Sequence, residues 1–276
     1  MQLYDQVSYE LARHLTLRYS SSFGMSSRLF ARHLQQHIYA IYGLVRVADE
    51  IVDTYRGHDA AKLLDQLASD THTAIKNQYS PNPIIHSFAL TAKKYEINQE
   101  LISPFFESMS MDLKAQTFTR DLYKKYIYGS AEVVGLMCLR IFCENDHALY
   151  GQLEPGARAL GAAYQKINFL RDLAADHREL DRVYFPDVDF ASFDESAKKM
   201  ICDDIAHDMA LAASAISRLP LTSRRAVSLS YRYYNELFKK LEKTPAAVIK
   251  SRRVRITDAQ KIYLLIYESS GLGSRK

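Results

Sequence analysis

Apolar residues recur at helical spacing along almost the whole chain, and few residues interrupt this periodicity. The 276 residues include ten Gly and seven Pro, about half of their usual share. A protein built of β-strands needs many tight turns, and Gly and Pro are the residues that make them. The sequence therefore predicts an all-α fold. No linker, low-complexity tract or internal repeat divides the chain, so we expect one domain over residues 1–276.

Helix start and stop signals divide the periodic pattern into segments. The expected helices cover residues 5–17, 27–56, 60–78, 83–95, 99–115, 120–144, 147–152, 156–178, 193–218, 222–242 and 246–267. Pro155 lies between two of them, and Pro104 is expected to kink the helix that contains it. Thr244 and Pro245 have the sequence of an N-cap followed by a first-turn proline, which predicts that the last helix begins there.

The composition excludes several classes of protein. Hydrophobic residues make up 47% and charged residues 25% of the chain, which is typical of a soluble globular protein. The cysteines, Cys138, Cys143 and Cys202, lack metal-ligand spacing and indicate free thiols in a reducing compartment. A net charge of +4 is too small to indicate a nucleic-acid partner. Residues 1–20 do not resemble a signal peptide, and no run of about 20 apolar residues is free of charges, so we expect a cytoplasmic protein.

A polar stripe runs along an otherwise apolar helical segment, residues 38–53. Tyr42, Arg46, Asp49 and Asp53 follow one another at intervals of 4, 3 and 4 residues, which places all four on one face of an α-helix. Most other positions of the segment are apolar, so this helix is expected to be buried on several sides. The stripe should therefore face an internal cavity rather than open water.

A second polar stripe has the same character and lies within residues 159–176. Gln165, Asn168, Asp172 and Asp176 are spaced by 3, 4 and 4 residues, and Arg171 flanks them. The surrounding positions are again apolar and rich in alanine. This helix is therefore also expected to present its polar face to a cavity.

Each stripe combines carboxylates with an arginine, and this combination limits the kinds of site that the two helices can form. A single acidic pair one turn apart is usually a solvated surface, but carboxylates about 6 Å apart inside a cavity repel one another unless a cation bridges them. The candidate ligands are all oxygen atoms, which favours Mg²⁺ or Mn²⁺ over zinc. Because bound Mg²⁺ accepts substrate phosphate oxygens and arginine binds phosphate in bidentate fashion, the pattern indicates a metal-assisted diphosphate site.

The same two segments resemble the paired aspartate-rich signatures of the phytoene/squalene synthase family, the head-to-head prenyl synthases. The first, Asp49-Glu50-Ile51-Val52-Asp53 preceded by Arg46, would not alone separate this family from head-to-tail prenyl synthases. The second, residues 165–176, holds Asn, Arg and two Asp in a fixed register and is specific. Further segments that resemble the family are 20–23, Tyr126, 134–137, 182–186, 231–238, Arg252, Arg253 and Lys261. Together they cover nearly the whole chain and look most like the bacterial phytoene synthases.

The resemblance implies an isoprenoid-synthase-type helical bundle around a central cavity, and it implies roles for individual residues. The implied metal ligands are Asp49, Asp53, Asn168, Asp172 and Asp176. The implied substrate contacts are Ser22, Arg46, Gln165, Arg171 and Tyr234. The implied catalytic residues are Asp49, Asp53, Asp172, Asp176, Tyr42 and Tyr126.

The implied reaction joins two geranylgeranyl diphosphates head to head and depends on Mg²⁺, with Mn²⁺ as an alternative. It would pass through a cyclopropyl (prephytoene) diphosphate, release diphosphate and give phytoene for carotenoid biosynthesis. NADPH is not expected, because the chain has no Gly-x-Gly-x-x-Gly fingerprint. The basic residues between Lys239 and Arg255 and the hydrocarbon product favour peripheral association with an anionic membrane surface.

Three other interpretations stay open at this stage. A dehydrosqualene or squalene synthase would use farnesyl diphosphate, and the depth of the pocket decides between the two substrates. A terpene cyclase or chain-elongating synthase would share the acidic stripes but not the Asn-Phe-Leu-Arg-Asp register. A non-catalytic lipid-binding or assembly protein on the same fold should have lost metal ligands. The oligomeric state stays open as well.

Overall fold

The computed structural model describes residues 2–55, 57–114, 118–180, 184–186 and 188–269. Within these ranges the regular structure is helical and contains no strand, which confirms the predicted all-α fold. The α-helices are α1 (Leu3–Tyr19), α2 (Ser21–Ser26), α3 (Arg32–Asp49), α4 (Ala60–Asn77), α5 (Pro83–Lys94), α6 (Gln99–Met111), α7 (Arg120–Ile127), α8 (Val133–Cys143), α9 (His147–Leu180), α10 (Glu195–Ile216), α11 (Leu221–Lys243), α12 (Ala246–Ile249) and α13 (Asp258–Ser269). A 3₁₀ turn, η1 (Ser27–Leu29), precedes α3, and the π-helical segments η2 (Glu50–Tyr55) and η3 (Tyr128–Glu132) follow α3 and α7.

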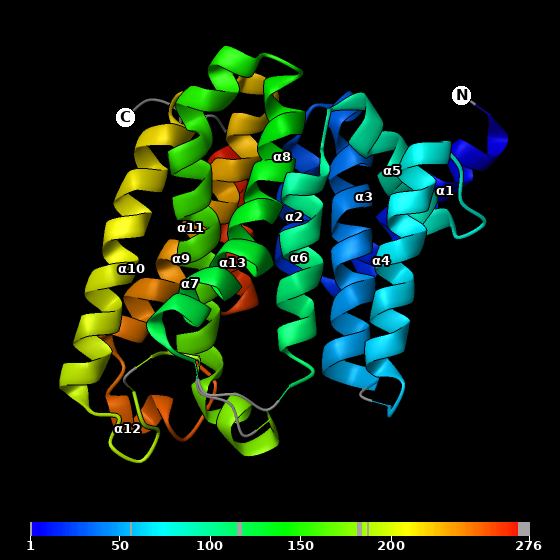
Figure 1. Cartoon of the computed structure of the whole chain (residues 1–276). Helices are drawn as coiled ribbons and strands as arrows, with labels where there is room; N and C mark the ends of the chain where they lie inside the picture. The colour runs from blue at the N-terminus through cyan, green and yellow to red at the C-terminus, as the bar shows by residue number, and fades with distance from the viewer. Residues whose placement is uncertain (1, 56, 115–117, 181–183, 187, 270–276) are drawn as a thin grey trace.

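The helices pack around two buried apolar clusters. One cluster is built mainly by α3, α5, α6 and α8, and the other by α7, α9, α10 and α11. Figure 1 shows α10 at one side of the molecule and α1 at the other, with α8, α6 and α3 between them. Helix α9 packs against both α8 and α10, and α3 packs against α1, α5 and α8. The helices that carry the two polar stripes, α3 and α9, are therefore central helices of their clusters.

The π-helical segment η3 crosses α6 at a very short distance, and a glycine makes this approach feasible. A Cβ atom on Gly129 would lie 2.2 Å from the Pro104 carbonyl oxygen and 2.8 Å from the Ser108 Cβ atom. A backbone oxygen cannot move away as a flexible side chain can, so only glycine fits at position 129 without a shift of α6. This contact sets the spacing between α6 and the segment that joins α7 to α8.

Gly129→Ala is therefore expected to lower the free energy of unfolding by about 1–3 kcal/mol, the usual cost of overpacking a buried site. Gly151→Ala is the matched control, because a Cβ atom on this helical glycine meets no neighbour within 4 Å. The control should gain up to about 1 kcal/mol from the better helix propensity of alanine. Denaturant unfolding measures both values, and equal stability of the two variants would contradict the close approach.

Several expected helix boundaries in the first two thirds of the chain are wrong, and the expected helix 120–144 is divided into α7, η3 and α8. No break occurs at Pro155, and α9 continues through it as one helix of 34 residues. Pro155 is exposed, so the carbonyl of Gly151 that loses its helical hydrogen bond can be solvated. The expected helix 27–56 is divided, because η1 precedes α3 and the α-helical pattern gives way to η2 after Asp49. Helix α6 continues on both sides of Pro104.

The expected final helix, 246–267, is interrupted over residues 250–257. Thr244 caps the C-terminus of α11 rather than the N-terminus of the next helix. Within the interruption, Val254 is buried in the second apolar cluster, and the Lys240 ammonium donates a hydrogen bond of 2.6 Å to the Arg255 carbonyl. Burial of one side chain and side-chain capping of the backbone stabilise this non-helical stretch. Helical periodicity alone could not indicate it.

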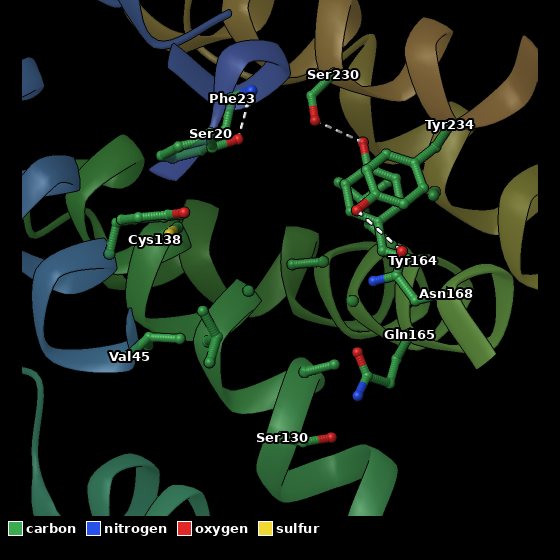
Figure 2. A pocket seen from close by; sticks show the side chains of 18 of the residues that line it. Ser20, Phe23, Val45, Ser130, Cys138, Tyr164, Gln165, Asn168, Ser230 and Tyr234 are labelled. Atoms are coloured by element: carbon green, nitrogen blue, oxygen red, sulfur yellow. Dashed lines mark hydrogen bonds between the residues drawn. The ribbon is translucent and has the colours of Figure 1, made fainter. Parts of the chain in front are cut away.

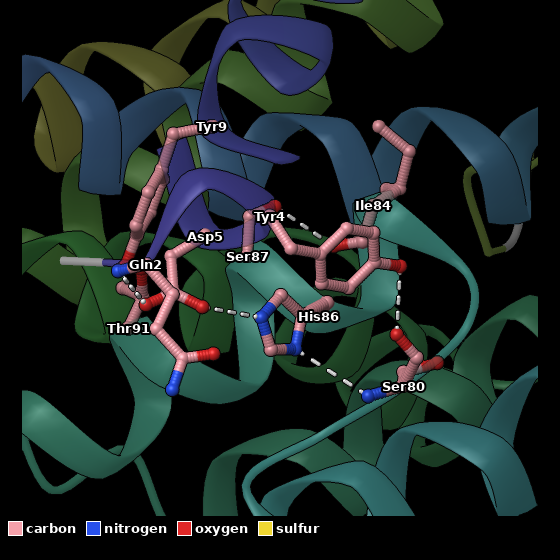
Figure 3. Close-up of polar contacts among 9 residues, drawn as sticks. All are labelled: Gln2, Tyr4, Asp5, Tyr9, Ser80, Ile84, His86, Ser87 and Thr91. Carbon is pink, nitrogen blue, oxygen red and sulfur yellow. Dashed lines mark hydrogen bonds and ion pairs between the residues drawn. The ribbon is translucent and has the colours of Figure 1, made fainter. Parts of the chain in front are cut away.

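Polar contacts attach α1 to α5 and to the turn before α5 (Figure 3). The buried His86 ring has Nε2 2.9 Å from Asp5 Oδ1 and Nδ1 3.4 Å from the Ser80 backbone nitrogen. Because the Ser80 N–H donates to Nδ1, the ring proton lies on Nε2 and is donated to Asp5, which lowers the pKa of that carboxyl. The Tyr4 hydroxyl adds a hydrogen bond of 2.8 Å to the Ser80 carbonyl. These contacts fix the N-terminal helix to the body of the protein.

A second polar cluster holds a neutral histidine between α1, α3 and α5. The Nδ1 atom of His37 lies 3.0 Å from Thr91 Oγ1 and 3.3 Å from the Tyr9 hydroxyl, and Nε2 lies 3.2 Å from Lys94 Nζ. Burial, together with the charge of Lys94, lowers the pKa of His37 to about 3. The folded protein therefore excludes a proton that a solvated histidine would bind in mild acid.

His37 should accordingly make the protein less stable as the pH falls. Between pH 6.5 and about pH 3 the unfolded chain gains a proton at position 37 that the folded protein does not, so the free energy of unfolding decreases. The decrease is at most about 1.4 kcal/mol per pH unit. His37→Gln cannot titrate and should lose less stability than the wild type between about pH 7 and pH 5. Denaturant unfolding at both pH values checks this, and equal losses in the two proteins would refute it.

One stretch of the described chain, Arg120–Cys143, is long and apolar enough to cross a membrane by length and composition alone. Its best window has a mean hydropathy of 1.4, and 56% of that window is buried inside the protein. The stretch contains charged residues, among them Lys124, Lys125, Glu132 and Arg140, so it is not the charge-free apolar run that the sequence was expected to lack. The stretch comprises α7, η3 and α8, and their side chains enter both apolar clusters. Because core helices of soluble proteins pass the same test, the finding is weak support for a membrane span.

Candidate active site

Helices α3, α8, α9, α10 and α11 and both π-helical segments line a cavity of about 880 Å³. Part of its wall is apolar and includes Phe30, Ile38, Leu139, Phe142, Leu153, Ile216, Leu219 and Val227. Another part carries the two polar stripes. Leu153 and Asp172 both line the cavity from α9 and lie 19 residues apart, which is about 28 Å at the rise of an α-helix. The apolar and polar parts are therefore at different ends of the cavity.

The first polar stripe faces this cavity. Tyr42, Arg46 and Asp49 of α3 and Asp53 of η2 all line it, in the orientation that their spacing predicts. The change from α-helix to π-helix occurs at Glu50, within the acidic motif. The hydrogen bonds of a π-helix span five residues, so Asp53 reaches the cavity through a wider turn than the sequence pattern assumes.

When no cation is bound, burial and repulsion by the Asp53 charge make ionisation of the Asp49 carboxyl unfavourable. The 31% of its side-chain surface that stays accessible faces the cavity, and burial together with the charge of Asp53 raises the pKa of Asp49 to about 7. Arg46 opposes this effect, with Nη1 3.9 Å from Asp49 Oδ2. The Arg46 guanidinium also pairs with Glu50 and lies 4.4 Å over the Tyr19 ring. A cation bound between Asp49 and Asp53 would remove the repulsion that raises this pKa.

The second polar stripe faces the same cavity from α9. Gln165, Asn168, Asp172 and Asp176 all line it, and so does Arg171. The face that the sequence pattern selects on α9 is thus the face that points to the cavity. Two acidic stripes from separate helices consequently share one chamber.

Two arginines bind Asp172 in the protein alone. Arg171 Nη2 lies 2.6 Å from Asp172 Oδ2, and Arg253 Nε lies 2.6 Å from Asp172 Oδ1. Arg253 comes from the non-helical residues 250–257, so the C-terminal part of the chain reaches the second stripe. The planar donors of the two guanidinium groups suit the oxygens of a phosphate group beside Asp172.

Helix α11 supports the second stripe through a pair of stacked tyrosines (Figure 2). The ring of Tyr234 lies on that of Tyr164 with centroids 3.7 Å apart and planes at 12°. The Tyr234 hydroxyl lies 3.5 Å from Asn168 Oδ1, at the limit of a hydrogen bond, and the Tyr164 hydroxyl donates to Ser230 Oγ at 3.1 Å. Figure 2 shows Gln165 and Asn168 pointing from α9 into the cavity. The stack thus fixes α9 and α11 relative to each other at this stripe.

The two tyrosines predicted at the reacting centre both line the cavity. Tyr42 stacks on Phe23 with centroids 5.1 Å apart and planes at 13°, and burial raises the pKa of its hydroxyl. Tyr126 is 3% exposed, and burial followed by the charge of Asp112 holds its pKa well above the usual value. Both phenols are therefore protonated in the neutral pH range.

The predicted substrate contact Ser22 is not brought to the cavity, whereas its neighbours Ser20 and Phe23 line it. Ser20 is the N-cap of α2, and its hydroxyl oxygen accepts a hydrogen bond of 3.1 Å from the Phe23 backbone nitrogen. Because residues three apart share one side of a helix, this turn directs Ser20 and Phe23 to the cavity and Ser22 to another side. The structure places Ser20, rather than Ser22, at the site.

The donor set fits magnesium that is held jointly by the protein and a substrate. Among the residues that the structure describes, no three His, Cys, Asp or Glu side chains come together as a metal site. Mg²⁺ usually binds one or two carboxylates together with waters and substrate phosphates, so it does not need such a cluster. The raised pKa of Asp49 indicates that a positive charge is favourable beside it. The oxygen ligands that fit this role are Asp49, Asp53, Asn168, Asp172 and Asp176.

Several polar residues that line the cavity have no site role predicted from the sequence, among them Asp112, Tyr164, Tyr184 and Arg253. Tyr184 belongs to the segment 182–186, of which residues 182 and 183 lie outside the described residues, as does Asp181 before them. The four come from different elements, so no periodic stripe connects them. The sequence gives a weak indication for Tyr164, because it directly precedes the second motif. It gives none for Asp112, which is an isolated acidic residue at the end of α6.

Comparison with known proteins places the chain in a family. A model described as squalene/phytoene synthase matches residues 16–260. The 4,4'-diapophytoene synthase of Staphylococcus haemolyticus (strain JCSC1435) is 26% identical over 209 residues, which cover 73% of this chain and 68% of that protein. The 15-cis-phytoene synthase of Synechococcus elongatus (strain ATCC 33912 / PCC 7942 / FACHB-805) is 29% identical over 206 residues, which cover 70% of this chain and 65% of that protein. The chain thus matches about two thirds of the length of these curated relatives.

Solved structures show the same fold. A dehydrosqualene synthase in complex with a ligand matches with a TM-score of 0.77 and 20% identity, over 98% of both chains. A squalene synthase from Alicyclobacillus acidocaldarius matches with a TM-score of 0.77 and 20% identity, over 88% of this chain and 96% of that chain. These likenesses confirm the predicted isoprenoid-synthase-type bundle. Since the family model covers most of the sequence, the chain belongs to the squalene/phytoene synthase family, a family of prenyltransferases.

Proposed function

We propose that this protein joins two geranylgeranyl diphosphates head to head to form phytoene, with Mg²⁺ as the metal and diphosphate as the leaving group. The observation that carries the proposal is that two acidic stripes, one from α3 and η2 and one from α9, line a single cavity whose far end is apolar. The similarity to phytoene synthases, at 29% identity for two of them, supports the choice of the C20 substrate.

The polar end of the cavity suits two diphosphate groups. Arg46, Arg171 and Arg253 line it, and guanidinium groups bind phosphate oxygens through parallel hydrogen bonds. Gln165 adds an amide donor on the same wall. Metal ions, when bound, would neutralise the charge that develops on the departing diphosphate. The residues that would hold them are Asp49, Asp53, Asn168, Asp172 and Asp176.

The apolar part of the cavity suits the prenyl chains and the allylic cation that remains when diphosphate departs. Its wall excludes water, which would otherwise capture the cation. Tyr42 and Tyr126 present aromatic rings to the cavity, and the negative face of such a ring stabilises a cation. Attack by the C2=C3 bond of the second substrate on this cation, with loss of a proton as the three-membered ring closes, would give the cyclopropyl (prephytoene) diphosphate. A second ionisation, rearrangement and loss of a proton would then give phytoene.

The test is to incubate the purified protein with Mg²⁺ and either geranylgeranyl or farnesyl diphosphate, with and without NADPH, and to identify the hydrocarbon by mass spectrometry. We expect a C40 hydrocarbon with a central conjugated triene from geranylgeranyl diphosphate, formed equally well without NADPH. A cyclic or longer linear product would contradict head-to-head condensation. Absence of product from both substrates would favour the non-catalytic lipid-binding or assembly function instead.

The second candidate function is the same head-to-head condensation with a C15 substrate, farnesyl diphosphate. The similarity to the diapophytoene synthase of Staphylococcus haemolyticus, at 26% identity, favours it almost as strongly as the phytoene synthases favour C20. Two farnesyl diphosphates would then give a C30 product through the same steps. Initial rates measured with each substrate in the same assay separate the two, because the substrate with the higher kcat/KM has the chain length that the cavity accepts.

A further inference from the structure

A buried carboxylate at the cavity wall joins three separate elements. Asp112 directly follows α6, is 6% exposed and lines the cavity. Its Oδ2 accepts a hydrogen bond of 2.7 Å from the Tyr126 hydroxyl, and its Oδ1 accepts one of 3.1 Å from the Tyr184 hydroxyl. Tyr126 belongs to α7, and Tyr184 follows α9 in the chain. One side chain thus connects α6, α7 and the segment after α9.

We propose that Asp112 is a positioning residue that orients the Tyr126 ring at the reacting centre and holds Tyr184 at the cavity wall. The inference rests on the proposed function, because it concerns the same cavity, and it extends that function to a residue outside both acidic motifs. Asp112 acts through the two tyrosines and not through the diphosphate.

The two hydroxyl groups matter because of the rings that they orient. Tyr184 stacks on Phe169 of α9 with centroids 4.0 Å apart and planes at 6°. The centroid of the Tyr126 ring lies 5.3 Å from that of Tyr184 and 5.8 Å from that of Phe169. The centroid of the Phe118 ring lies 5.3 Å from that of Tyr126 and 5.2 Å from that of Tyr184. Each tyrosine is therefore held by a hydrogen bond at its hydroxyl and by other rings along its sides. Removal of the shared acceptor would take this hydrogen bond from both hydroxyls at once.

The chemistry of the acceptor predicts a graded response to substitution. Both phenols are donors to the carboxylate, which has an oxygen for each of them. Asparagine has one acceptor oxygen, so it can accept a hydrogen bond from only one of the two hydroxyls. Its NH2 group would have to donate a hydrogen bond to the oxygen of the other hydroxyl. Leucine keeps neither and leaves two buried hydroxyls without this partner. The orientation of Tyr126 should therefore be disturbed more by Asp112→Leu than by Asp112→Asn.

The kinetic test compares these two variants with Asp121→Asn, which removes an exposed carboxylate from the first turn of α7. With Mg²⁺ and the prenyl diphosphate substrate, kcat should fall about tenfold in Asp112→Asn and about a hundredfold in Asp112→Leu, since misplacement by about 1 Å has effects of this size. KM should stay within about twofold of the wild-type value, because the diphosphate contacts are intact. Asp121→Asn should keep the wild-type kcat. An unchanged kcat in Asp112→Leu, or a loss confined to KM, would overturn the proposal.

Cleavage by chymotrypsin supplies a measurement that does not depend on activity. Tyr184 is 7% exposed, so the folded protein should resist cleavage after it, whereas Phe185 precedes Pro186 and is not a chymotrypsin site. If Asp112 holds Tyr184 in place, cleavage after Tyr184 should be at least about tenfold faster in Asp112→Leu than in Asp121→Asn, at a temperature where circular dichroism shows both to be folded. Equal rates would refute the positioning role even if the wild type formed no hydrocarbon. A wild type without product would refute the proposed function and leave the cleavage result to decide on Asp112.

Discussion

Asp49→Asn and Asp172→Asn are each expected to reduce turnover at least about a hundredfold while the protein stays folded. Stabilisation of transition-state charge by a bound metal ion contributes several kcal/mol, and every 1.4 kcal/mol corresponds to about tenfold in rate. An amide at either position keeps the size of the side chain but weakens the metal site. Asp49 shares its end of the cavity with Asp53, so the loss of one charge should not destabilise the folded protein.

The measurement is steady-state turnover with saturating Mg²⁺, together with thermal unfolding of each variant. Asp65→Asn is the matched control, because Asp65 is exposed on α4 and does not line the cavity. It should leave both turnover and stability unchanged. Wild-type turnover in Asp49→Asn or Asp172→Asn would contradict the assignment of these residues as metal ligands.

Removal of divalent metal is expected to abolish turnover and to weaken substrate binding, and added Mg²⁺ should restore both. The four aspartates of the two stripes and the substrate diphosphate would otherwise place about seven negative charges at one end of the cavity, where partly buried charges are less well screened than charges in open solvent. Within the protein itself, burial and then the charge of Asp53 already raise the pKa of Asp49 to about 7.

Two measurements check the effect of metal removal. Product formation in the presence of a chelator should fall to background, and Mn²⁺ should substitute for Mg²⁺ because it also prefers oxygen ligands. Titration calorimetry with a non-hydrolysable prenyl diphosphate analogue should show at least about tenfold weaker binding without metal, which corresponds to 1.4 kcal/mol. Undiminished turnover in the chelated protein would exclude the proposed role of the metal.

The orientation of both polar stripes could be predicted from the sequence because it follows from local geometry. Residues spaced by three and four lie on one face of a helix, and a polar face on an apolar helix must point to a cavity or to water. Tyr42, Asp49, Asn168 and Asp172 therefore reach the cavity as expected. The all-α fold was predictable for a similar reason, since it follows from the scarcity of Gly and Pro.

The features that could not be predicted depend on contacts between distant parts of the chain. Arg253 pairs with Asp172 across 81 residues of sequence, and Tyr184 donates to Asp112 across 72. The interruption at 250–257 exists because Val254 is buried and side chains cap the backbone there. The helix through Pro155 exists because the affected carbonyl can reach solvent. None of these causes leaves a periodic pattern in the sequence.

The continuous course of α9 along the cavity bears on which length of prenyl chain would fit there. This one rod of 34 residues, about 50 Å long, carries Leu153 at the apolar end of the cavity and Asp172 at the polar end. If the diphosphate binds beside Asp172 as proposed, the far end of a prenyl chain would lie toward Leu153 on the same helix. A substitution at Leu153 would then change the length of chain that fits without altering Asp172.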